Sequence, residues 1–131
     1  MTASVTASFS TWDTATSCDL FRYGELPTSE RTALRNGENL VFWGPMTDAK
    51  VITKTTAWYT RSTKAIVEAE IQKNDDLAWG IDPDGELPAF SPGSAAYDIR
   101  NIATHEAGHV CGLADLYGPR DTGLTMYGYG V

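Results

Sequence analysis

The sequence is poor in residues that several classes of protein require. Its 131 residues include only two histidines and two cysteines, and no apolar run approaches the roughly 18 residues of a membrane span. The two cysteines, Cys18 and Cys111, stand too far apart in sequence to form a CxxC redox or zinc pair. Ten basic residues face 17 acidic ones, and the basic residues do not cluster. This argues against nucleic acid as the main partner, because phosphate binding depends on clustered Lys and Arg.

The remaining composition is that of an ordinary soluble domain. Hydrophobic residues make up 42% and charged residues 21% of the chain, which is typical of a globular protein and not of a disordered one. The first ten residues have neither a basic start nor an apolar core segment, so we expect no secretory signal in this chain. No linker divides the sequence, and we therefore predict one domain over residues 1–131.

Hydrophobic periodicity predicts an α+β fold of the α/β sandwich type. A helical pattern over residues 2–16 is followed by short strands at 19–23 and 39–43 and by an antiparallel hairpin with arms 50–60 and 65–73. By alternation, one face of the second arm carries Ile66, Glu68, Glu70 and Gln72, and we expect this face to be solvated. A loop follows over 75–92, and Asp98 is the expected N-cap of a helix from about Ile99 to Cys111.

The last predicted helix carries the pentapeptide His105-Glu106-Ala107-Gly108-His109, an H-E-x-x-H motif. Residues four apart lie on the same face of a helix, so both imidazoles can reach one zinc ion. Glu106 lies one step around the helix, where its carboxylate can reach a water molecule at the metal. A solvated helix face without metal is the simpler alternative, but the motif occurs on a capped helix, as the zinc mechanism requires.

A catalytic zinc site needs a third protein ligand and leaves the fourth position for water. Both histidines are already used, and Gly112 is followed closely by Asp115, which is therefore the strongest candidate. The alternative is that Asp115 is a surface or capping acid, in which case Asp121 is the next candidate ligand.

At this point the chain resembles a known family. The run from His105 to Asp115 resembles the elongated zinc motif of metzincin metallopeptidases, with aspartate where most members carry a third histidine, as in snapalysin and some matrixin-like enzymes. Thr125-Met126-Tyr127-Gly128-Tyr129 resembles the Met-turn of that family. The tyrosine that assists catalysis in some branches, two positions after the Met, is replaced here by Gly128.

The resemblance implies a twisted mixed sheet with one antiparallel edge strand, a backing helix at residues 2–16 and the active-site helix. On this comparison the family's first strand and C-terminal helix are not evident in the chain. Substrate would pair as an extended strand with the edge strand around Thr53, Thr55 and Trp58, and Tyr127 would line an apolar pocket. The alternatives are an ordinary edge strand protected by lysines and a tyrosine that only packs.

The expected function is that of a zinc endopeptidase with one catalytic ion, in which Glu106 is the general base. A zinc-binding module without turnover is the alternative, and a different zinc hydrolase is a third possibility. Peptide or protein is the expected substrate, the chain is expected to be a monomer, and the resemblance implies secretion. Asp82-Pro83-Asp84-Gly85-Glu86 is similar to a calcium loop, although a plain turn is favoured. Cys18 and Cys111 are candidates for a disulfide, or otherwise for two buried thiols.

Overall fold

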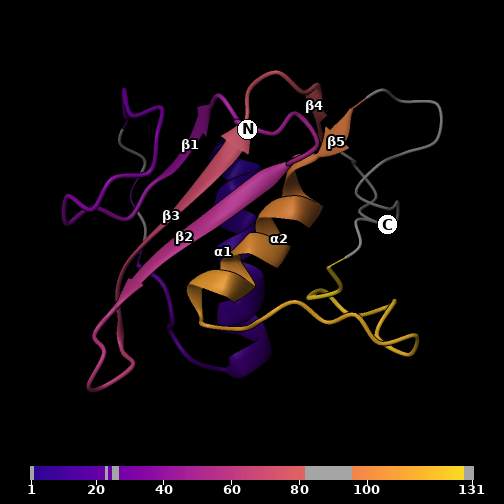
Figure 1. Cartoon of the computed structure of the whole chain (residues 1–131). Helices are drawn as coiled ribbons and strands as arrows, with labels where there is room; N and C mark the ends of the chain where they lie inside the picture. Colours follow the sequence, from indigo (N-terminus) through magenta and orange to yellow (C-terminus); the bar gives the residue numbers. More distant parts are fainter. Residues whose placement is uncertain (1, 23, 25–26, 82–95, 129–131) are drawn as a thin grey trace. The chain divides into compact units, whose positions relative to one another are not determined.

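The chain forms two compact units, one of residues 26–77 and one of residues 1–25 together with 78–131. The computed structural model describes residues 2–22, 24, 27–81 and 96–128. Within those ranges the fold is mixed α+β, with two helices, a small mixed sheet and no barrel (Figure 1). This confirms the α+β class, whereas the metzincin-like arrangement stays a prediction. Neither helix has the length and apolar character that crossing a membrane requires, among the residues described. That the whole chain acts as one domain stays a prediction.

The unit of residues 26–77 contains a three-stranded sheet with the order β1-β3-β2. Strand β1 (Val41–Gly44) pairs parallel with β3 (Ile66–Asn74), whereas β2 (Thr53–Tyr59) pairs antiparallel with β3 from Thr53 opposite Lys73 to Tyr59 opposite Ile66. A register shift interrupts the antiparallel ladder between Trp58 and Tyr59. The predicted hairpin and its antiparallel edge strand are therefore both present, as Figure 1 shows.

The prediction of a solvated face on β3 is wrong. Glu68 is 5% exposed and Glu70 fully buried, because the segment that precedes β1 folds over them. The carboxylate of Glu68 accepts the backbone N–H groups of Asn36 and Gly37, and that of Glu70 accepts the N–H of Leu34. Alternation separates the two faces of a strand but gives no information on whether an irregular segment covers the polar one.

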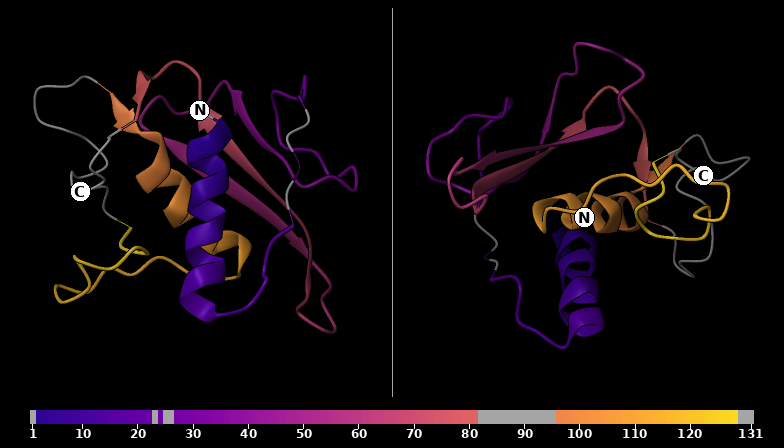
Figure 2. Two further views of the ribbon diagram at one scale, coloured as in Figure 1. Left: turned by 180° about the vertical axis from the view of Figure 1, so that it is seen from behind. Right: turned by 60° about the horizontal axis from the view of Figure 1, so that its bottom comes forward.

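The other unit is built on two helices, α1 (Thr2–Thr16) and α2 (Ile99–Val110), which pack against each other (Figure 2). The buried hydroxyl of Ser8 donates to the carbonyl of Arg100 at 2.9 Å, and the indole N–H of Trp12 donates to the carbonyl of Thr104 at 2.8 Å. A short parallel pair, β4 (Trp79–Gly80) and β5 (Tyr97–Asp98), leads directly into α2. Both predicted helices are thus confirmed, with α1 over the predicted residues.

The predicted strand at residues 19–23 is wrong for the part of it that is described, residues 19–22. The carboxylate of Asp13 in α1 accepts the N–H groups of Leu20 at 2.7 Å and Phe21 at 3.2 Å, so these amides are not available to a sheet. The Phe21 ring packs edge-on against Phe9, with ring centroids 4.7 Å apart. The segment therefore folds back on α1. The apolar residues Leu20 and Phe21 suggested a strand because the pattern does not include their contacts with the preceding helix.

Two further expectations concern the loops and the cysteines. The calcium-like segment of residues 82–86 lies outside the described residues. Cys18 and Cys111 are both free thiols, and both residues are exposed, so the structure contains neither the disulfide nor the two buried thiols.

Candidate metal centre

Helix α2 is positioned by a cap at each end. Asp98 is the N-cap, and its carboxylate accepts the N–H groups of Arg100 and Asn101, both at 3.1 Å. At the other end Gly112 adopts a φ of 87°, which turns the chain sharply after Val110 and allows the N–H of Leu113 to bond the carbonyl of Gly108 at 3.0 Å. Because of this turn, the segment that carries Asp115 returns toward the histidines.

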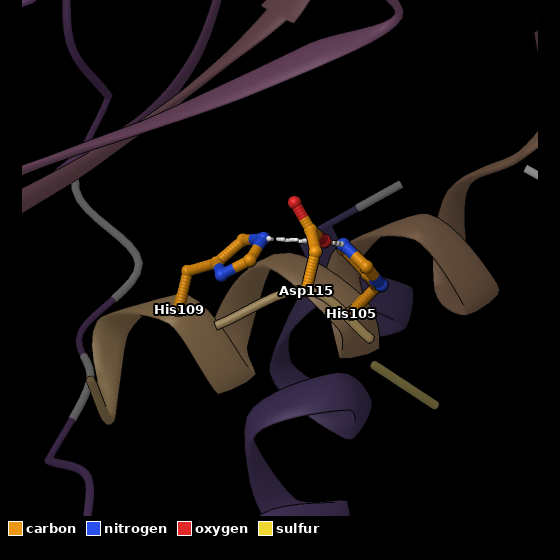
Figure 3. Close-up of side chains that lie close together, drawn as sticks. All are labelled: His105, His109 and Asp115. Carbon is orange, nitrogen blue, oxygen red and sulfur yellow. Dashed lines mark hydrogen bonds and ion pairs between the residues drawn. The ribbon is translucent and has the colours of Figure 1, made fainter. Parts of the chain in front are cut away.

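His105, His109 and Asp115 converge on one point, as Figure 3 shows. The Nε2 atoms of His105 and His109 lie 3.1 Å apart, and the Oδ1 atom of Asp115 lies 3.0 Å and 3.4 Å from them, respectively. Ligand atoms at about 2.0–2.2 Å from a tetrahedral ion are separated by about 3.3–3.6 Å. The triangle of these three atoms is therefore close in size to one face of a tetrahedral site, with two edges slightly shorter.

Backbone carbonyls determine which ring nitrogen of each histidine faces this point. The Nδ1 atoms of His105 and His109 lie 2.8 Å from the carbonyl oxygens of Thr125 and Leu113, respectively. A carbonyl oxygen only accepts hydrogen bonds, so each Nδ1 carries the proton and donates it. In the neutral ring each Nε2 then has a lone pair directed at the centre, which is the usual arrangement of histidine ligands.

Three atoms with lone pairs facing one another repel unless a cation lies among them. The Oδ1 atom of Asp115 is buried and has no hydrogen-bond partner in the described residues. A single proton on one histidine would pair with this oxygen but would leave the lone pair of the other histidine facing the same centre. A metal ion satisfies all three atoms at once, and this group is able to hold one.

The three side chains of the site are only partly buried. The side chains of His105, His109 and Asp115 are 19%, 22% and 31% exposed. Three protein ligands, rather than four, are typical of catalytic zinc sites, and the group found among the described residues has three.

Glu106, the predicted general base, lies on α2 next to His105 and is 7% exposed. A carboxylate with so little exposure is shielded from bulk water, so a nearby cation would act strongly on it. Its catalytic role stays a prediction.

Met126 packs beneath the helix, against the glycine between the two histidines. A β-carbon on Gly108 would overlap the Sδ atom of Met126 and would lie 2.9 Å from the Cζ2 atom of Trp12. Met126 itself is 6% exposed. The motif therefore has glycine at position 108 because α1 and the segment around Met126 both approach the helix there.

The other candidate residues are not among the three that converge. Asp121 uses its carboxylate to accept the N–H of Gly118 at 3.1 Å, so it closes a turn and lies outside the metal group. Tyr127 is half-buried and pairs with Leu116 in an isolated bridge. Three candidates lie on β2, in the other unit: Thr53, Thr55 and Trp58. Roles in binding substrate stay predictions for these residues and for Tyr127.

Sequence analysis missed Tyr117, whose hydroxyl donates a hydrogen bond to the Oδ2 atom of Asp115 at 3.1 Å. The only signal available was its position two residues after the candidate ligand. It also missed the carbonyl partners of the histidines, because backbone atoms of Leu113 and Thr125 leave no mark in the sequence.

Cys111, the C-cap of α2, is the nearest thiol to the ligands in sequence. Although the residue as a whole is exposed, partial burial of its thiol raises the pKa above the ordinary 9.0, and the negative charge of Asp13 raises it further. The thiol therefore stays protonated near neutral pH, which disfavours it as a competing metal ligand.

No family model matches the chain, and comparisons with curated proteins and with solved structures gave no significant match.

Proposed function

We propose that the protein is a zinc-dependent endopeptidase whose ion is held by His105, His109 and Asp115. The observation that carries the proposal is the convergence of two imidazole nitrogens and one carboxylate oxygen, with edges of 3.0, 3.1 and 3.4 Å. Magnesium and calcium prefer sites made of oxygen atoms, whereas two nitrogens and one oxygen in this geometry are typical of zinc hydrolases. Zinc is therefore the ion that this donor set fits best.

A bound zinc ion would supply Lewis-acid polarisation of the scissile carbonyl and would acidify a water molecule. The protein would contribute the base. The carboxylate of Glu106 accepts the proton of the attacking water and returns it to the nitrogen of the leaving amine. The Nδ1 bonds of the two histidines to Thr125 and Leu113 keep the rings oriented, so that the ligands need little reorganisation.

The choice of peptide as substrate rests on the resemblance to metzincins, supported by the packing of Met126 under the zinc helix. We propose that an extended peptide pairs with the edge strand β2 around Thr53 and Thr55, because backbone pairing accepts any sequence. Trp58, on the same strand, would then contact a side chain of the peptide. The role of Tyr127 in lining an apolar pocket rests on the resemblance alone. A secreted monomer is the form we expect.

Metal content and protein cleavage should be measured together, on the wild type and on three variants. Glu106→Gln removes the base with little change in shape, His109→Ala removes a ligand, and Glu38→Gln is a matched control at an exposed glutamate in the other unit. We expect the wild type and Glu38→Gln to bind one zinc ion and to cleave an unstructured protein. Glu106→Gln should keep the zinc but lose about 10²- to 10⁴-fold in rate. His109→Ala should lose both.

The result also separates the proposal from its alternative, a zinc-binding module without turnover. The low exposure of Glu106 is compatible with that alternative, because it suits a packing role as well as a catalytic one. Zinc bound by the wild type and by Glu106→Gln, with cleavage by neither, would establish the module. Equal cleavage by both proteins would show that Glu106 is not the base.

A further inference from the structure

The two carboxylate oxygens of Asp115 have different surroundings. Oδ1 faces the histidines and is buried, whereas Oδ2 accepts a hydrogen bond from the hydroxyl of Tyr117 at 3.1 Å. One oxygen is thereby presented to the metal position and the other is held away from it. The hydrogen bond from Tyr117 thus favours one orientation of the carboxylate.

The tyrosine is itself held by the segment around Met126. The N–H of Leu116 bonds the carbonyl of Met126 at 2.8 Å, and the N–H of Gly128 bonds the carbonyl of Leu116 at 2.9 Å. A β-carbon on Gly128 would lie 2.6 Å from the Cε1 atom of the Tyr117 ring. The same β-carbon would lie 2.9 Å from the Cβ atom of Asp115. The backbone at Gly128 thus supports both the ring and the ligand from one side.

We propose that Tyr117 is a positioning residue that makes Asp115 a one-oxygen ligand. The inference rests on the proposed metal site. A rotation that brought Oδ2 to the metal position as well would move this oxygen from its place beside the Tyr117 hydroxyl and would stretch a hydrogen bond that is now 3.1 Å long. By opposing this rotation, the hydroxyl orients the third ligand and keeps a coordination position free for water, which a hydrolytic site requires.

The test is a zinc titration of the wild type, Tyr117→Phe and Tyr59→Phe. Tyr117 and Tyr59 are similarly exposed, at 56% and 59%, and Tyr59 lies on β2 in the other unit, so it is a matched control. Loss of a hydrogen bond to a ligand weakens metal binding by about 10- to 100-fold, and we expect the lower end because Tyr117 is exposed. Tyr59→Phe should bind zinc as the wild type does. The visible absorption of the cobalt-substituted protein should weaken in Tyr117→Phe, as it does when cobalt gains a fifth ligand.

A second background shows whether the hydroxyl acts through the carboxylate. In Asp115→Ala the hydrogen bond has no acceptor, so adding Tyr117→Phe should leave the already weakened zinc affinity unchanged. An equal loss of affinity in both backgrounds would overturn the proposal, and so would an unaltered affinity in Tyr117→Phe alone.

These readouts do not depend on catalysis. If the wild type binds zinc and cleaves nothing, the peptidase proposal fails while the affinities still decide the role of Tyr117. If the wild type binds no zinc, both proposals are overturned.

Discussion

Replacing Gly108 with alanine tests whether packing or helix propensity determines this position of the zinc helix. In an isolated helix the substitution stabilises by about 0.8–1 kcal/mol, because glycine loses more backbone freedom on folding. In this protein the added methyl group would overlap the sulfur of Met126 and would press on the ring of Trp12 at 2.9 Å.

The two neighbours differ in how easily they move. Met126 is a flexible side chain that can change rotamer. Trp12 is a rigid ring, anchored by its N–H bond of 2.8 Å to the carbonyl of Thr104. Overpacking of this kind costs about 1–3 kcal/mol, and the rigid ring places the cost in the upper part of that range. After the gain in propensity is subtracted, we expect Gly108→Ala to lower the free energy of unfolding by about 1–2 kcal/mol.

Urea unfolding followed by circular dichroism measures this difference. Gly123→Ala is the control, because a β-carbon there meets nothing within 4 Å, and the change should stay within about 0.5 kcal/mol. In a Met126→Ala background one of the two overlaps is absent, so the cost of Gly108→Ala should be smaller. An increase of about 1 kcal/mol in stability on Gly108→Ala would refute the reasoning, since propensity alone would then account for it.

Two further predictions concern the pH dependence of stability and the helix cap. Burial raises the pKa of Glu70 above the ordinary 4.5, and the nearby carboxylates of Glu68, Glu30 and Glu38 raise it further against the opposing hydrogen bond from Leu34. As the pH rises, the unfolded chain therefore loses the proton of Glu70 at a lower pH than the folded protein does. The protonated carboxyl of Glu70 contributes fully to stability below about pH 4.5, and this contribution is lost as the pH rises through the pKa of Glu70 in the folded protein. Urea midpoints measured over a pH series should show this decline in the wild type, a smaller decline in Glu38→Gln, which removes one of the nearby carboxylates, and none in Glu70→Gln. An identical decline in Glu70→Gln would contradict the assignment. Asp98→Ala removes the acceptor of two helix N–H groups and should lower the free energy of unfolding, by the same measurement, by about 1 kcal/mol. Asp98→Asn keeps an acceptor oxygen and should lower it by less. An unchanged free energy of unfolding in both variants would show that the cap contributes nothing.

Much of the fold could be predicted from the sequence alone, namely the elements that depend on local spacing and capping. The helix at residues 2–16, the hairpin and the Asp98-capped helix are all present, because each depends on spacing or capping within a few residues. The strand at residues 19–23 failed because Asp13 captures its amides, a contact that the pattern of apolar residues does not record.

Part of the candidate metal site could likewise be predicted from the sequence, and part depends on the tertiary structure. The spacing of His105 and His109 places both rings on one helix face, and the turn at Gly112 brings Asp115 back to them, so a sequence reading suffices for these three residues. The tautomers, the orientation of the carboxylate and the need for glycine at position 108 were decided by Thr125, Tyr117, Met126 and Trp12. These features depend on backbone carbonyls and on packing between segments up to about a hundred positions apart. Helical and strand periodicity contains no information on such contacts. Sequence determined which atoms can bind a metal, and the tertiary structure determined how they are aimed.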